Sequence, residues 1–301
     1  MGRALRDAFP PIERQLSRID RAALRPLSAA MDGPAGLLFP EKTHPDPAVS
    51  MEVVMELSLA VALSLTEAGA RPGAAAGRSM GEYSAAAFAG VLAARDCLEL
   101  VSFVTLRGQE DCLAQPSVLA TVYGLTRREL AAAAEKVAAA GEPCEVTVFY
   151  DKARLGVAGL RASALPLLKE ALSPLRHRLS LSREPGAFHT SLFDRLASRA
   201  AARFGETPFS APAIPLYMNA DARRAASGRA VREKLAAALN SPVLWQETIA
   251  RMLADGVRTF VEIAPGAMLT EFVCELPPDA EVLRTDTPES YSRTLRRLAG
   301  K

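Results

Sequence analysis

Cysteine and histidine are scarce in this chain, and both shortages exclude classes of protein. The 301 residues include four cysteines and three histidines. The cysteines are scattered without a C-x-x-C pair, so the sequence indicates neither a zinc site nor a disulfide framework. We expect them to be reduced thiols in a cytoplasmic protein. Three histidines also argue against a histidine-rich metal centre.

Long apolar runs and an excess of charge of one sign are missing as well. No apolar run approaches the length of a membrane span, and residues 1–16 lack the apolar core of a secretory signal. The formal net charge is only +2, from 36 basic and 34 acidic residues, which leaves no nucleic-acid footprint. Hydrophobic residues make up 49% of the chain, as in a globular protein. We therefore expect a monomer without membrane or nucleic-acid partners.

The segment Gly77-Arg78-Ser79-Met80-Gly81 is the most informative motif that the sequence contains. It follows the small apolar run 73–76 and precedes the helix-like run 83–89. This order predicts a strand, an abrupt turn and a helix with Ser79 at the apex, which is the geometry of a nucleophile elbow. A serine held there can be acylated, because the N–H groups that open the helix face the oxyanion. The pattern also arises by chance in chains rich in glycine, alanine and serine, so its context has to decide.

Hydrophobic periodicity predicts an α/β chain with a small inserted unit. Helices at 51–67 and 95–114 flank the elbow. Between residues 117 and 181 the predicted order is β-α-β-β-α-β, the ferredoxin-like split unit. Its predicted elements are strands 117–124, 144–150, 155–160 and 178–181 and helices 126–140 and 163–172. We therefore predict a small subdomain at 117–183 and a large subdomain built from residues 1–116 and 184–301.

After Pro185, strands again alternate with helices, as in a mostly parallel sheet covered on both faces. The predicted helices there are 192–204, 231–239, 245–255, 268–275 and 288–298, and the predicted strands are 214–218, 259–263 and 281–284.

Four stretches carry a family resemblance. GRSMGEYSAAAFAGVL (77–92) is similar to a G-H-S-x-G-E-Y-S-A nucleophile segment, and the predicted helix 95–114 contains Leu106-Arg107-Gly108. GAFHTSLFD (186–194) is similar to H-A-F-H-S-P-L-M, and residues 239–273 resemble an S-P-V-x-W to E-x-G-P-G region. Together they resemble the malonyl-CoA:acyl-carrier-protein transacylase family, which includes the acyltransferase domains of polyketide synthases. The resemblance implies an α/β-hydrolase-like large subdomain with a mostly parallel sheet, plus an inserted ferredoxin-like βαββαβ subdomain.

The resemblance implies an S-malonyltransferase that works by a two-step acyl exchange. Ser79 would take a malonyl group from coenzyme A as an ester, and the phosphopantetheine thiol of an acyl carrier protein would remove it. His189 would deprotonate Ser79 and later the thiol, with its ring oriented by a backbone carbonyl near Ala238. The reaction belongs to fatty-acid or polyketide biosynthesis, and the resemblance implies no metal or organic cofactor. By itself, His189 is also compatible with a purely structural histidine at the start of a helix.

Three further residues are implied to contact the substrate. Arg107 would pair with the malonyl carboxylate through its planar fork, although it lies about one helical turn later than the family's arginine; a solvent-facing helix arginine is the alternative. Phe188 would leave little room for an α-methyl branch and so favour malonyl. The Met80 N–H would donate to the oxyanion.

The sequence also departs from the family pattern. It begins after the family's first strand and G-Q-G-S-Q loop, so we expect one oxyanion donor to be missing, a loss of about 3 kcal/mol. Arg78 replaces a histidine, and it would hold an acyl or phosphate group or face solvent. Tyr150 replaces an asparagine, Ala238 a glutamine, and Ala264-Pro265-Gly266 a Gly-Pro-Gly. Two alternatives therefore stay open: an acyl-carrier-protein thioester hydrolase of the same fold, and a weakly active or non-catalytic interaction protein.

Overall fold

The computed structural model describes residues 2–22, 47–182, 186–263, 265–266, 269 and 276–300. The helices are α1 (Gly2–Ala8), α2 (Pro10–Ala22), α3 (Pro47–Glu67), α4 (Gly81–Phe88), α5 (Ala94–Ala114), α6 (Arg127–Ala139), α7 (Leu165–Leu172), α8 (Asp194–Gly205), α9 (Gly228–Ala237), α10 (Trp245–Ala254) and α12 (Pro288–Leu298). The strands are β1 (Ala75–Ala76), β2 (Ser117–Tyr123), β3 (Cys144–Tyr150), β4 (Leu155–Arg161), β5 (Arg178–Leu181), β6 (Leu216–Met218), β7 (Arg223–Arg224), β8 (Thr259–Glu262) and β9 (Glu281–Arg284). Apart from Leu269, the predicted helix 268–275 lies outside the described residues.

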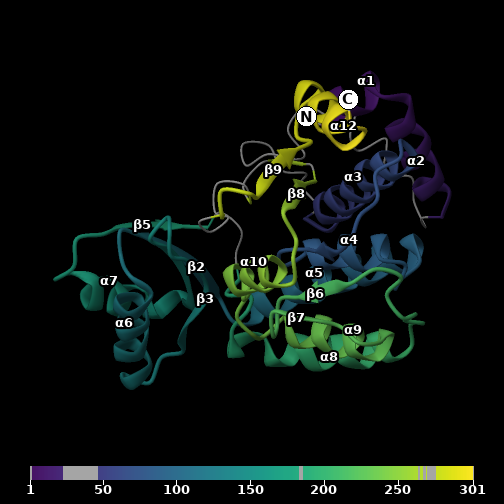
Figure 1. Ribbon diagram of the computed structural model, residues 1–301. Helices are drawn as coiled ribbons and strands as arrows, with labels where there is room; N and C mark the ends of the chain where they lie inside the picture. Colours follow the sequence, from purple (N-terminus) through teal and green to yellow (C-terminus); the bar gives the residue numbers. More distant parts are fainter. Residues whose placement is uncertain are drawn as a thin grey trace.

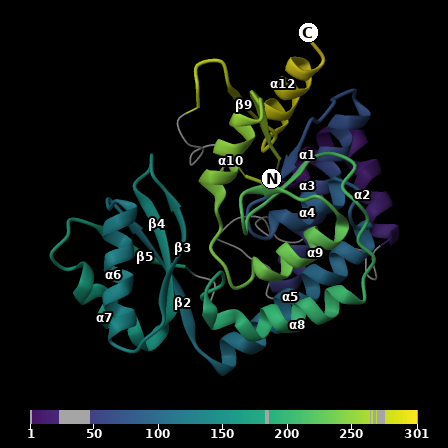
Figure 2. The ribbon, with the colours of Figure 1, turned by 60° about the horizontal axis from the view of Figure 1, so that its bottom comes forward.

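Strands β2 to β5 form one antiparallel sheet in the order β3-β4-β2-β5. Helices α6 and α7 cover its outer face, away from the rest of the molecule, in both views (Figures 1 and 2). Thr126 caps α6 through a capping box in which its hydroxyl accepts from Glu129 N and Glu129 bonds back to Thr126 N. This β-α-β-β-α-β order confirms the fold class that the sequence predicted for the inserted unit.

A bulge in β3 decides which side chains face the rest of the molecule. The register of β3 against β4 shifts between Val146 and Val148. Side chains of a regular strand alternate between faces, and one extra residue reverses that alternation. As a result, Val146 and Phe149 pack with α6 and α7, whereas Val148 and Tyr150 pack on the other face with Trp245.

The remaining elements surround two small sheets. Strand β1 pairs in parallel with β6, which pairs antiparallel with β7, and β8 pairs in parallel with β9. The largest hydrophobic core lies among α1 to α5, α8 and α9, and Val53, Leu57 and Val61 of the apolar helix α3 are fully buried in it. Helices α1 and α12 lie side by side near both chain ends (Figure 1), where the Phe9 and Tyr291 ring centroids are 4.4 Å apart.

The chain enters and leaves the four-stranded sheet at one place. Gly186 N donates to Ser117 O over 2.8 Å, and Ala187 N donates to the Ser117 hydroxyl over 3.0 Å. Residues 183–185, where the predicted subdomain boundary falls, lie outside the described residues. Among the helices that the structure describes, none is long and apolar enough to cross a bilayer.

Candidate active site

Ser79 and His189, which the sequence singled out as nucleophile and base, meet in the structure. Ser79 lies in the turn between β1 and α4, and its Oγ is 2.7 Å from Nε2 of His189, 110 residues away in the chain. Both residues have left-handed backbones, with φ of 53° at Ser79 and 67° at His189. A left-handed non-glycine residue costs on the order of 1–3 kcal/mol, and such residues cluster at functional sites. The turn therefore presents the serine hydroxyl to the imidazole at the expense of local strain.

Gly77 is the glycine that the sharp turn requires. A Cβ at this position would lie 2.0 Å from the backbone oxygen of Gly81, so no other residue fits without moving the turn. By contrast, a Cβ at Gly81 would have nothing within 4 Å. Of the two glycines in the motif, only the first is demanded by close backbone approach.

Backbone carbonyls hold the His189 ring and main chain. Nδ1 of His189 lies 2.6 Å from the Ala238 carbonyl oxygen, and His189 N donates to Leu239 O over 3.0 Å. Because a carbonyl only accepts, Nδ1 carries the proton and Nε2 is left to accept from the Ser79 hydroxyl. Burial lowers the pKa of His189 to about 4; the Ala238 carbonyl opposes this shift and the charge of Arg78 adds to it. The imidazole is therefore neutral at pH 7 and ready to take a proton.

Asn219 and Glu82 brace the turn from behind. The Asn219 side chain accepts from Ser79 N over 2.7 Å and donates to Gly77 O over 2.6 Å. Its own backbone N donates to Oε1 of Glu82 over 2.6 Å. Asn219 is fully buried and Glu82 is 2% exposed. Burial raises the pKa of Glu82 to about 8, although the Asn219 hydrogen bond opposes the shift.

Asn219 and Glu82 are not among the residues predicted from the sequence, although a signal for them is present. Asn219 directly follows β6, which is parallel to β1, and the carboxyl ends of parallel strands meet at one edge of a sheet. A polar residue at the end of the strand neighbouring the elbow was therefore a candidate for contact with it. Glu82 lies in the first turn of a short helix whose other side chains are small or apolar.

Phe188 and Arg107 are placed differently with respect to Ser79 and His189. Phe188 packs on Gly108 of α5, where a Cβ would come within 2.8 Å of the ring, and it stacks on Phe193 with centroids 4.2 Å apart. Arg107 points elsewhere: it forms an ion pair with Glu110 and lies over the Phe103 ring at 5.8 Å. Its side chain is 41% exposed. None of these contacts brings Arg107 to Ser79 or His189.

Arg78 and Tyr150 face each other across the space between the elbow and the four-stranded sheet. The guanidinium carbon of Arg78 lies 5.7 Å from the centroid of the Tyr150 ring. Tyr150 is 2% exposed and projects from the bulged strand β3. Met80 follows Ser79 as the N-cap residue of α4, so its N–H lies where the helix itself supplies no acceptor.

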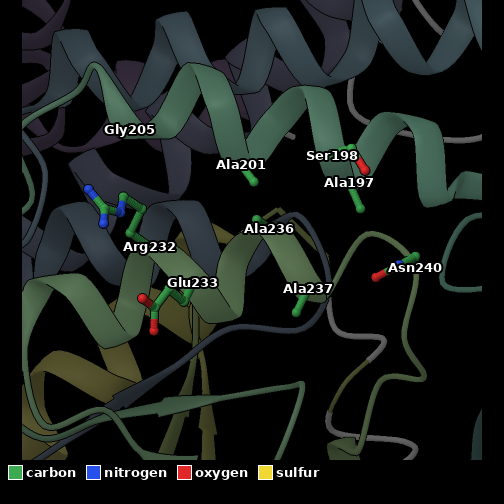
Figure 3. Close-up of a pocket in the computed structure, with 9 residues that line it drawn as sticks. All are labelled: Ala197, Ser198, Ala201, Gly205, Arg232, Glu233, Ala236, Ala237 and Asn240. Atoms are coloured by element: carbon green, nitrogen blue, oxygen red, sulfur yellow. The ribbon is translucent and has the colours of Figure 1, made fainter.

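A groove between α8 and α9 lies near the residues whose carbonyls bind His189 (Figure 3). Residues of both helices line it, from Gly205 and Arg232 at one end to Asn240 at the other. Asn240 follows Leu239, whose carbonyl accepts from His189. The lining includes neither Ser79 nor His189, so the groove is separate from the reacting atoms. Within the described residues there is also no cluster of three or more His, Cys, Asp or Glu side chains that could hold a metal ion.

A known family and known relatives match most of the chain. Residues 47–279 match the family model described as acyl transferase domain. The chain is 30% identical over 227 residues to the malonyl CoA-acyl carrier protein transacylase of Haemophilus influenzae, covering 74% of this chain and 71% of that protein. It is 26% identical over 304 residues to the transacylase of the same name from Bacillus subtilis, covering 99% of this chain and 92% of that one.

Solved structures share the fold. A malonyl-transacylase in complex with its type II PKS acyl-carrier protein superimposes with a TM-score of 0.88 at 24% identity, covering 99% of this chain and 94% of that one. FabD from Acinetobacter baumannii also gives a TM-score of 0.88, at 21% identity, with 100% and 94% of the two chains covered.

Proposed function

Since the chain belongs to the acyl transferase domain family, we propose that it transfers a malonyl group from coenzyme A to the phosphopantetheine thiol of an acyl carrier protein. It is an S-malonyltransferase, and its partners are a coenzyme A thioester and an acyl carrier protein. The observation that carries the proposal is the 2.7 Å contact between Ser79 Oγ and His189 Nε2 at the elbow. The transacylase names of the relatives do not favour the hydrolase alternative.

In the first half-reaction, His189 Nε2 takes the proton of the Ser79 hydroxyl while Oγ attacks the thioester carbonyl. The resulting oxyanion meets the Met80 N–H at the opening of α4. The carbon–sulfur bond then breaks, and the coenzyme A sulfur leaves with the proton held by His189. The Ala238 carbonyl, at 2.6 Å from Nδ1, stabilises the imidazolium while it exists.

In the second half-reaction the same base serves the acceptor. His189 takes the proton of the phosphopantetheine thiol, and the thiolate sulfur attacks the malonyl ester carbonyl. The bond to Ser79 Oγ breaks, and Oγ recovers its proton from the imidazolium. Phe188, packed against Gly108 beside the base, narrows the space near the acyl α-carbon and favours an unbranched acyl group.

The proposal also covers the subdomains, the cofactor and the location of the protein. Residues 117–183 are the small subdomain, and the segments before and after them form the large one; the hydrogen bonds of Ser117 with Gly186 and Ala187 support this division. The proposed chemistry uses side chains, backbone groups and the substrate, so it requires no resident cofactor. We also propose a cytoplasmic location, where coenzyme A thioesters are available to the enzyme.

The test is to incubate the protein with labelled malonyl-CoA and then with a holo acyl carrier protein. We expect label on Ser79 that moves to the carrier thiol. Ser79→Ala should take no label, and His189→Ala should slow labelling by about a hundredfold to ten-thousandfold, the usual contribution of a general base. Wild-type protein that takes no label would refute the proposal. Release of malonate without transfer to the carrier would instead establish the hydrolase.

A further inference from the structure

Arg78 places a positive charge directly beside the nucleophile. It precedes Ser79 in the elbow, and its guanidinium reaches the Tyr150 ring of the four-stranded sheet, 5.7 Å from guanidinium carbon to centroid. The Nε atom of Arg78 is buried. Its charge also acts on His189, where it lowers the pKa. The guanidinium thus lies between the elbow and β3, within electrostatic reach of both reacting residues.

The dimensions of a malonyl ester match this position. In an ester on Ser79, the second carboxylate is two carbon–carbon bonds from the acyl carbonyl, so its oxygens lie about 3–5 Å from Oγ by standard bond lengths. The phosphates of coenzyme A are separated from the same carbonyl by the pantetheine arm, roughly 15 Å when extended. A cation on the residue next to the serine therefore fits the acyl carboxylate rather than the phosphates.

We propose that Arg78 binds the free carboxylate of the malonyl group and so selects a carboxylated acyl donor. This inference rests on the proposed transferase function. A guanidinium that lies over the Tyr150 ring, as that of Arg78 does, can present two N–H donors to a carboxylate. The β3 bulge contributes because it turns Tyr150 toward the elbow instead of toward α6 and α7.

Arg107, the residue that the family resemblance suggested for this role, is positioned differently. Gly108 of α5 faces Phe188 beside the base, and Arg107 is rotated from it by about 100° around the helix. Its guanidinium pairs with Glu110, which also accepts from Arg199 over 3.0 Å. In this structure Arg107 belongs to an ion-pair network on the outer side of α5, while Arg78 lies beside Ser79.

The experiment compares malonyl-CoA with acetyl-CoA, which lacks the second carboxylate, in acylation of Ser79 followed by intact-protein mass spectrometry. Arg78→Gln should lower the second-order rate constant for malonyl-CoA by about tenfold to a hundredfold, the usual loss for a charge-assisted bidentate contact. The second-order rate constant of Arg78→Gln with acetyl-CoA should change by less than about threefold. Arg78→Lys should fall between wild type and Arg78→Gln with malonyl-CoA, because it keeps the charge and loses the fork.

Arg107→Gln is the matched control, and it should keep the malonyl-to-acetyl ratio of the wild type. The inference is overturned if Arg78→Gln keeps that ratio, or if it slows both donors equally, since an equal loss means that Arg78 supports the elbow and does not read the carboxylate. Retained acetylation in Arg78→Gln shows that the variant is folded. Absence of any acylation in wild-type protein would instead refute the transferase function, and the inference with it.

Discussion

Replacing Glu82 by glutamine should remove a large pH dependence of stability. Burial raises the pKa of Glu82 from 4.5 to about 8, so the folded protein keeps this proton up to about pH 8 while the unfolded chain loses it near pH 4.5. The stability that the protonated carboxyl provides is complete below pH 4.5 and is lost as the pH rises toward 8. Each pKa unit corresponds to about 1.4 kcal/mol, so the loss between pH 5 and pH 8 is about 3.5 kcal/mol.

Glutamine has the same shape and does not titrate. Its side-chain oxygen can still accept from Asn219 N, which lies 2.6 Å from Glu82 Oε1. The urea m-value of a chain of this size is about 3 kcal/mol/M. The midpoint of Glu82→Gln minus that of wild type should therefore increase by about 1 M from pH 5 to pH 8.

The assay is urea unfolding at pH 5, 6, 7 and 8, followed by circular dichroism and by the fluorescence of Trp245, the only tryptophan. Glu135→Gln, at an exposed position on α6, is the control and should follow the wild type at every pH. If the difference in midpoint between Glu82→Gln and wild type stays constant from pH 5 to pH 8, the buried carboxyl does not hold its proton and the reasoning fails.

Two other predictions concern the reacting turn. Acylation of Ser79 should persist into acid and fall with a midpoint near pH 4, because the base is neutral above the His189 pKa of about 4; stopped-flow acylation from pH 4 to pH 8 that shows a midpoint near 6.5 would contradict the buried imidazole. In Gly77→Ala the new Cβ would lie 2.0 Å from Gly81 O. The variant should lose about 1–3 kcal/mol of stability, as overpacked variants do, and its acylation should be at least about tenfold slower, since about 1.4 kcal/mol corresponds to a factor of ten. Gly81→Ala, with open space at its Cβ, is the matched control in thermal unfolding and acylation, and equal losses in the two variants would refute the steric argument.

Local sequence patterns predicted what local interactions determine. The helix that follows Thr126, the strands from Ser117 to Leu181 and the strand–turn–helix around Ser79 each depend on residues close together in the chain, and each is present in the structure. The order of these elements was enough to predict the fold class of the inserted unit.

Features that depend on distant contacts could not be predicted in this way. Nothing local to Asn219 indicates that its side chain bonds to Gly77 and Ser79, because that contact requires β1 and β6 to be neighbours. The β3 bulge leaves no mark in the alternation of an apolar strand, yet it determines where Tyr150 points. Glu110, the partner of Arg107, is also bound by Arg199 of α8, and that contact requires α5 and α8 to be neighbours.

The hydrogen bonds of Ser117 with Gly186 and Ala187 tie the general base to the folding of the inserted sheet. Only Phe188 lies between these hydrogen-bonded residues and His189, so they limit how far the backbone of His189 can move. Loosening β2 from the chain that leaves the sheet would leave His189 to its hydrogen bonds with the Ala238 and Leu239 carbonyls, while Asn219 would still brace the serine turn. The position of the general base therefore depends on how the inserted sheet joins the rest of the chain, whereas the position of the nucleophile depends on Asn219.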